Sequence, residues 1–164
     1  MIAPEPSIEN DRALAEAWRA LATASGVVSE DVLLEEYEAL FVGVGRPPVM
    51  LYGSFYLAGF LNEKPLAELR TDLARMSFAR DIEARETEDH LAALCDVMRA
   101  MILGDVANAP ATVDEQKHFF LKHLQPWAMQ CCDATIKNDN SNYYRRVAEF
   151  ARVFFQIEIA SIQM

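Results

Sequence analysis

Apolar residues recur along most of this chain at spacings of three and four positions, the period of an amphipathic α-helix. The stretch that follows Pro65, for example, aligns Leu66, Leu69, Leu73 and Met76 on one face. The strict alternation that is typical of strands is nearly absent. About seven helices are predicted, over residues 8–25, 30–41, 65–76, 87–101, 113–124, 126–136 and a stretch after residue 142. The predicted fold class is therefore all-α, a helical bundle.

Residues that favour helix ends stand at several of the expected boundaries. Ser7 and Ser29 can cap the first two helices, and Gly26 can end the first. Thr112 and Glu115 match the capping box, in which each side chain accepts a hydrogen bond from the other residue's backbone. The last helix aligns Val147, Phe150, Phe154 and Ile157. Loops are expected where Gly, Pro or Asn break the period, over residues 43–51, 104–111 and 138–142, and a short apolar segment is expected over 54–61.

The length and composition of the chain favour one domain. Its 164 residues are 52% hydrophobic, enough to bury a core without disulfides or a metal. We therefore predict a single domain over residues 1–164. The first residues have neither the basic start nor the apolar stretch of an export signal, and no apolar run reaches the roughly 18 residues of a membrane helix. Three cysteines, an odd number, suit a reducing compartment, so we predict a cytoplasmic protein.

The net charge of −10 is concentrated in two acidic blocks. Residues 1–40 hold nine acids and two bases, and residues 81–115 hold the same numbers. Such blocks repel phosphate, so nucleic acid and anionic membranes are poor partners. A basic peptide would be attracted, although acids can also serve only to keep a protein soluble.

No motif in the sequence marks out a catalytic or metal site. Phosphate-binding glycine loops and nucleophile elbows are absent, and neighbours such as Asp89 and His90 on one helix would point about 100° apart. Glu115 and His118 have a spacing that di-iron bundles use, but a second such pair is missing. We predict a protein that is not an enzyme and carries no cofactor, with a helical metalloenzyme as the remote alternative. The pair Cys131 and Cys132 is interpreted as small apolar residues.

Two segments stand out from the helical pattern. Aromatic residues flank the Gly- and Pro-rich loop, from Tyr37 to Tyr56, and can form either core or a groove for a peptide. Residues 86–91 (ETEDHL) place three acids and a histidine together. These acids can simply stabilise the start of a helix, or they can form an acidic pocket for a cationic ligand.

In order and spacing, these segments resemble the TorD/DmsD/NarJ family of redox-enzyme maturation chaperones. The family pattern Glu-Pro-x-Asp-His-Leu is similar to residues 86–91, with Thr87 in place of Pro. The family's aromatic-Leu-Phe stretch, Pro-rich loop and Ser-x-aromatic element are similar to Tyr37, Leu40-Phe41, Pro47-Pro48 and Ser54-Phe55-Tyr56. Residues 123–127 (HLQPW) and 143–144 (YY) resemble two later family elements, and the region before residue 30 is shorter than in typical members.

The resemblance implies an all-helical chaperone that works in the cytoplasm. It implies binding to the twin-arginine signal peptide, or to the apo form, of a molybdopterin-containing oxidoreductase of the dimethyl sulfoxide reductase class. The chaperone assists cofactor insertion and holds its client back from export until the client is mature. The family includes domain-swapped dimers, which makes a homodimer compatible with the resemblance, and weak guanine nucleotide binding has been suggested for some members. The alternative is a helical scaffold that binds a folded partner surface.

A twin-arginine signal combines a basic segment with an apolar stretch, and its binder needs both kinds of contact. Exposed ion pairs contribute only about 0.2–1 kcal/mol each, whereas micromolar affinity needs about 8 kcal/mol, so apolar contact must supply most of it. The candidates for apolar contact are Tyr37, Leu40, Phe41 and Tyr52. The candidates for the arginines are Glu86, Glu88 and Asp89, with His90 as the pH-sensitive member. Ser54 and Trp127 complete the predicted peptide-binding set.

Overall fold

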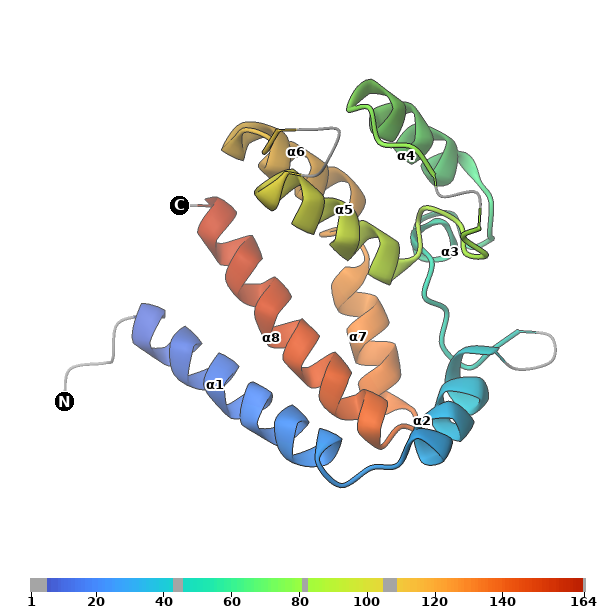
Figure 1. Cartoon of the computed structure of the whole chain (residues 1–164), viewed down its shortest axis with the longest axis vertical. Helices are drawn as coiled ribbons and strands as arrows, with labels where there is room; N and C mark the ends of the chain where they lie inside the picture. Colours follow the sequence, from blue (N-terminus) through green and yellow to red (C-terminus); the bar gives the residue numbers. More distant parts are fainter. Residues whose placement is uncertain (1–5, 43–45, 81–82, 105–108, 164) are drawn as a thin grey trace. The chain divides into compact units, whose positions relative to one another are not determined.

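A computed structural model describes residues 6–42, 46–80, 83–104 and 109–163 (Figure 1). Over those ranges the chain forms eight α-helices and one π-helical turn, and its only β feature is an isolated bridge between Tyr52 and His90. The all-α prediction is therefore confirmed. The elements are α1 (Pro6–Ser25), α2 (Glu30–Tyr37), η1 (Glu38–Val42), α3 (Gly53–Ala58), α4 (Lys64–Arg75), α5 (Leu91–Leu103), α6 (Val113–His123), α7 (Ala128–Lys137) and α8 (Tyr143–Gln163).

The chain divides into two compact units. Residues 1–50 together with 129–164 form the first unit, and residues 51–128 form the second. The prediction of a single domain over the whole chain stays a prediction. Among the described helices, none is both long enough and apolar enough to cross a bilayer.

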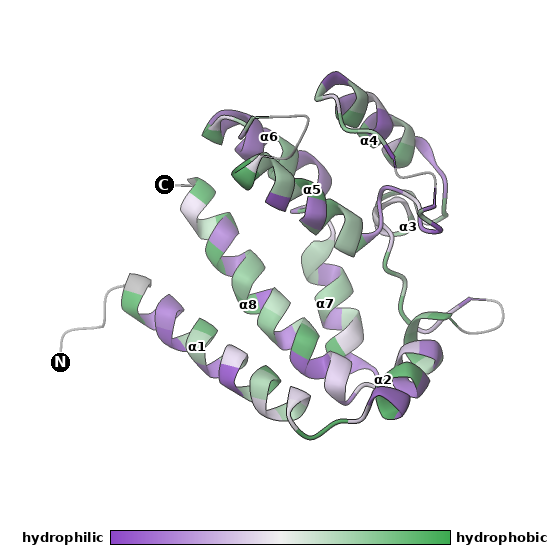
Figure 2. Ribbon diagram, viewed as in Figure 1, coloured by the Kyte–Doolittle hydropathy of each residue, from purple (hydrophilic) through white to green (hydrophobic). Residues whose placement is uncertain are grey.

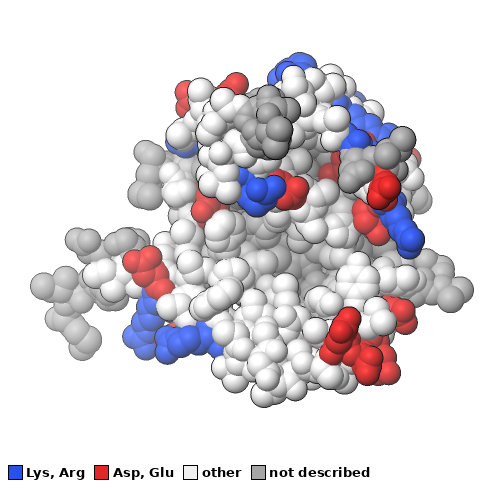
Figure 3. Space-filling model, viewed as in Figure 1, with Lys and Arg blue, Asp and Glu red and all other residues white. Residues whose placement is uncertain are grey.

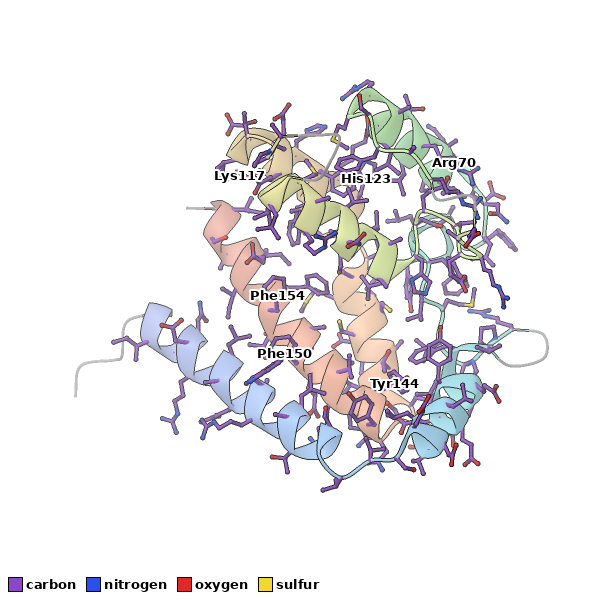
Figure 4. The ribbon with its side chains drawn as sticks, in the orientation of Figure 1. Arg70, Lys117, His123, Tyr144, Phe150 and Phe154 are labelled. Carbon is purple, nitrogen blue, oxygen red and sulfur yellow. The ribbon has the colours of Figure 1, made fainter. Side chains whose placement is uncertain are left out.

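In the first unit, α1 packs along α8, and α2 also contacts α8. Both long helices are amphipathic, with hydrophobic and hydrophilic residues alternating around them in Figure 2. Trp18 of α1 meets Phe150 of α8 with ring centroids 5.5 Å apart (Figure 4). The exposed acids of α2 and η1 gather on the surface in Figure 3, where they account for part of the first acidic block. They are Glu30, Asp31, Glu35 and Glu38.

The predicted inner stripe of α8 is wrong in one position. Phe154 is exposed, and its neighbour Phe155 is buried together with Ala148 seven residues earlier. The helix is held on one side through Phe150 and on another by an ion pair of 2.7 Å between Arg152 and Asp133 of α7. Periodicity alone cannot choose between two adjacent phenylalanines when a helix has contacts on more than one side.

In the second unit, α3 packs against α4 and α5 against α6. Three of the four residues of the predicted α4 stripe are buried, which confirms it: Leu66, Leu69 and Leu73. The capping box at the start of α6 is also confirmed, because Thr112 and Glu115 exchange side-chain and backbone hydrogen bonds. The cap at Ser29 is present, and α1 ends just before Gly26 as expected.

The remaining boundaries follow the sequence less closely. Helix α1 begins at Pro6, so Ser7 is not the residue that precedes it. The short apolar segment forms an additional helix, α3, followed by a connector with left-handed backbone at Gly59 (φ 85°) and Asn62 (φ 59°). The loops predicted over 43–51 and 104–111 are present in part, and their residues 43–45 and 105–108 lie outside the described residues.

Candidate functional site

Two segments that are far apart in the sequence lie against each other in the second unit. The backbone N–H of Gly53 donates to the carbonyl of Asp89 at 2.9 Å, and that of Leu91 donates to the carbonyl of Leu51 at 2.8 Å. These bonds join the start of α3 to the segment that leads into α5. Seven of the ten predicted peptide-binding residues belong to this unit: Tyr52, Ser54, Glu86, Glu88, Asp89, His90 and Trp127.

The buried carboxylate of Asp89 organises this junction. It accepts hydrogen bonds from the backbone N–H of Ser54 at 2.8 Å and from the hydroxyl of Thr87 at 2.6 Å. A proline at position 87 could not donate that second bond, because it has no hydroxyl group.

The same contacts explain why the helix predicted from residue 87 begins at Leu91 instead. Residues 86–89 form a turn whose conformation is set by Asp89, and His90 is the N-cap, with its Nδ1 accepting from the N–H of Ala92 at 3.2 Å. Glu88 and Asp89 therefore stand before the first turn of α5 and not within it.

On the outside of the junction, Tyr52, Glu86 and His90 form one surface cluster. The hydroxyl of Tyr52 donates to the carboxylate of Glu86, and the ring of Tyr52 meets that of His90 edge-on with centroids 5.2 Å apart. Burial lowers the pKa of His90 below its usual value, against the opposing effect of Glu86 and Asp89. His90 is therefore a neutral hydrogen-bond acceptor near neutral pH, which its capping role requires.

Glu88 already holds a guanidinium group from within the chain. Arg70 of α4 donates to both carboxylate oxygens, with its Nε at 3.0 Å from each and its Nη2 at 2.9 Å from Oε2 (Figure 4). Burial raises the pKa of Glu88, but the bonds from Arg70 outweigh it and hold the pKa below its usual value. Glu88 is therefore an ionised carboxylate whose charge is matched by Arg70.

A hollow of about 100 Å³ opens beside Asp89. Its walls are Gly53, Ser54, Leu57, Pro65, Glu68, Asp89, Lys122, His123 and Trp127. The hydroxyl of Ser54 is buried, and within the described part of the chain it has no hydrogen-bond partner. A polar group that entered the hollow could satisfy this hydroxyl. The walls carry two carboxylates, of Asp89 and Glu68, against the single ammonium group of Lys122, which is paired with Asp72, and this balance favours a cationic group.

Four of the ten predicted residues are almost completely buried: Leu40 and Trp127 are 0% exposed, Ser54 1% and Asp89 3%. Trp127 donates its indole N–H to the carbonyl of His123 at 2.7 Å and stacks on Tyr56. Burial leaves these four no exposed surface on which a peptide could pack, and Ser54, Asp89 and Trp127 could meet a ligand only inside the hollow that they line.

Of the three predicted residues of the first unit, Tyr37 and Phe41 form an aromatic cluster with Tyr144, and Leu40 is buried. Tyr37 and Phe41 pack against each other and against Tyr144 of α8, with centroid distances of 5.2, 5.8 and 5.2 Å. The carboxylate of Glu36 fixes this arrangement by accepting from the N–H groups of Asn142, Tyr143 and Tyr144 at 2.8–3.0 Å. Neither Glu36 nor Tyr144 was predicted as a site residue, because a contact across more than a hundred residues leaves no local pattern.

Asp72 forms a second buried charge network next to the hollow. Its carboxylate accepts from Lys122 Nζ at 2.5 Å and from His123 Nε2 at 2.8 Å. His123 is labelled in Figure 4. Burial raises the pKa of Asp72, but these bonds outweigh it and the pKa is lowered. Burial lowers the pKa of His123 more than Asp72 raises it, so the positive charges that face Asp72 at neutral pH are those of Lys122 and of Arg75, whose Nη1 lies 3.6 Å from the carboxylate.

This network gives a pH prediction. The unfolded chain takes up the proton of His123 near pH 6.5, whereas the folded chain resists it, so the free energy of unfolding should fall as pH drops from 7 to 5. Asp72 stays ionised between pH 7 and 5, because its pKa is lowered. Its contribution to the free energy of unfolding is therefore lost only at more acidic pH. Urea unfolding at a series of pH values measures the slope of the free energy of unfolding against pH. His123→Gln should flatten this dependence in part, with His90 contributing the rest. An unchanged slope in His123→Gln would contradict the assignment.

The described residues do not support the metal alternative. Among them, no group of three histidine, cysteine or acidic side chains is arranged to hold an ion. Glu115 uses its carboxylate in the capping box, where it accepts from the N–H and the hydroxyl of Thr112 at 2.8 and 2.7 Å.

Comparison with known proteins gives a consistent set of matches. The family model described as nitrate reductase delta subunit matches residues 8–133. The chaperone protein TorD of Aliivibrio fischeri is 26% identical over 142 residues, covering 79% of this chain and 65% of the relative. TorD of Vibrio parahaemolyticus is 24% identical, covering 78% and 63%. A probable Tat proofreading chaperone DmsD of Haemophilus influenzae is 28% identical over 118 residues, covering 71% and 55%. The chain therefore spans somewhat less than two thirds of the length of these relatives.

Proposed function

This chain belongs to the nitrate reductase delta subunit family, and we propose on that basis that it is a chaperone for the maturation of a molybdopterin-containing oxidoreductase. It binds the twin-arginine signal peptide of its client, the apo enzyme, or both. The names of its relatives, TorD chaperone and Tat proofreading chaperone, support this role. The client is an enzyme of the dimethyl sulfoxide reductase class, which is held in the cytoplasm until its cofactor has been inserted. The chain itself is not an enzyme, and a homodimer is compatible with the role.

The observation that carries the proposal is the acidic junction between α3 and residues 86–90. Glu86 is exposed there, with Tyr52 and His90 half-buried beside it. The bonds between Arg70 and Glu88 are an internal example of the contact that a client arginine would make, since a planar guanidinium matches a carboxylate bidentately. A client arginine can approach Glu86 from solvent, and a second can approach the hollow beside Asp89.

The other predicted residues take supporting roles in this proposal. Ser54 and Asp89 hold the junction together, and Trp127 packs against Gly53 at the start of α3. Tyr37 and Phe41 are half-buried, and we propose that their edges add apolar contact for the client. Leu40 fixes the turn that carries Phe41, because its carbonyl accepts from the N–H of Val49 at 3.0 Å.

Calorimetric titration with twin-arginine signal peptides of molybdoenzymes tests the proposal. We expect one peptide to bind with micromolar or tighter affinity. Its version with two lysines in place of the arginines should bind more weakly, because an ammonium cannot make the bidentate contact. Glu86→Gln should weaken binding of the arginine peptide about two- to fivefold, the range of an exposed ion pair.

Asp96→Asn is the matched control, because Asp96 is an exposed acid of α5 in the same unit. It should leave the affinity unchanged. Equal effects of the two substitutions would show a general charge effect instead of a site. If no signal peptide binds but an apo enzyme without its signal does, the chain recognises a folded client surface. Failure of both would refute the chaperone proposal.

A further inference from the structure

A group of exposed apolar side chains lies at the end of α3 and on the connector that leads to α4. Leu57 is 43% exposed, Phe60 72% and Leu61 42%. We call these three residues the connector surface. Scattered apolar residues are normal on a protein surface. Three within five positions, one of them aromatic, form an apolar patch of the kind that binds a ligand or a partner.

The backbone holds the connector surface in place. Gly59 and Asn62 both have left-handed backbone, and the N–H of Gly59 donates to the carbonyl of Phe55 at 2.8 Å to close α3. A side chain at position 59 would find open space but would have to adopt φ 85°, so glycine is needed for the backbone and not for the packing. Phe60 stands between these two fixed residues and is directed to solvent by the turn itself.

The connector surface is continuous with the hollow. Leu57 lines the hollow at one end of the connector, and Pro65 lines it beyond the other end. Glu68 and Asp89 contribute carboxylates to the same walls. An extended ligand could therefore place a cationic group at the carboxylates and its following apolar residues on Leu57, Phe60 and Leu61.

We infer that the connector surface binds the apolar stretch that follows the arginines of the client's signal peptide. This inference rests on the proposed function and changes where the apolar contact is made. The sequence assigned that contact mainly to aromatic residues of the first unit, of which Leu40 is buried and Tyr37 and Phe41 already pack against Tyr144. Charge complementarity favours this occupant, because residues 51–128 carry twelve acids and eight bases, and a basic segment leads the apolar one in such a signal.

Phe60→Ser tests the inference. Titration with the binding signal peptide should show about tenfold weaker affinity, and Leu57→Ser and Leu61→Ser should show smaller losses, since a large exposed aromatic is the expected anchor. A shortened peptide that keeps the arginines but lacks the apolar stretch should bind both proteins much more weakly than the full peptide, and Phe60→Ser to the same extent as the unaltered protein. Because Phe60 is exposed, the circular dichroism spectrum should not change.

Leu103→Ser provides the matched control, because Leu103 is 67% exposed at the end of α5 in the same unit. It should bind the full peptide like the unaltered protein. The inference is overturned if Phe60→Ser binds normally, if Leu103→Ser is weakened as much, or if the loss persists with the shortened peptide. Absence of any peptide binding to the unaltered protein would refute the proposed peptide recognition itself, and the two failures are therefore distinguishable.

Discussion

Replacing Trp127 by alanine should lower the free energy of unfolding by about 3–5 kcal/mol, the usual cost of removing a fully buried tryptophan. Its side chain is completely buried, stacks on Tyr56 with ring centroids 5.5 Å apart, and donates its N–H to His123. It also lies directly against Gly53, where an added Cβ would come within 2.9 Å of the indole nitrogen. Removing the ring therefore leaves a cavity and an unpaired carbonyl under α3.

The second tryptophan of the chain is a natural control for this experiment. Trp18 is 56% exposed and makes a ring contact with Phe150, so Trp18→Ala should cost about 1 kcal/mol. Urea unfolding followed by far-ultraviolet circular dichroism compares the two variants without relying on tryptophan fluorescence, which both changes alter. If Trp127→Ala cost no more than Trp18→Ala, the buried role of Trp127 would be wrong. The peptide affinity of Trp127→Ala should fall only to the extent that the junction unfolds.

The helices could be predicted from the sequence because their causes are local. The spacing of Leu66, Leu69 and Leu73 reports directly which face of α4 is buried, and the capping box at Thr112 and Glu115 needs only residues within one turn. Wherever the determining contact was distant, the prediction failed. Helix α5 begins at Leu91 because Asp89 is engaged with Ser54, a partner 35 positions earlier that no local pattern identifies.

The candidate site shows the same limit. The sequence identified the segments that carry the junction, but it could not separate the residues that face solvent from those that support them. A buried Trp127 and a half-buried Tyr52 look alike in an aromatic pattern, since only tertiary packing distinguishes them. The exposure of the connector surface could not be predicted either. Phe60 reads as one more member of an apolar segment, and its exposure follows from the left-handed residues on either side of it.

Glu36→Ala is expected to be the most damaging change in the first unit, with a loss of about 2–4 kcal/mol in the free energy of unfolding. The carboxylate of Glu36 accepts three backbone N–H groups around the start of α8, at residues 142–144, where intrahelical partners do not exist. Its negative charge also interacts favourably with the positive end of that helix. Alanine removes all of these contacts. The backbone N–H groups of residues 142–144 then lose their acceptor in a partly buried place that water reaches poorly.

Glu35→Ala separates this role from the general effect of losing an acid, because Glu35 is the exposed neighbour on the same helix. It should change the free energy of unfolding by less than about 0.5 kcal/mol. Glu36→Gln should fall between the two, since the amide keeps an acceptor oxygen but loses the charge. Near-ultraviolet circular dichroism should report loosening of the cluster of Tyr37, Phe41 and Tyr144 in Glu36→Ala alone. Equal unfolding energies for the two alanine variants would show that the start of α8 does not depend on Glu36.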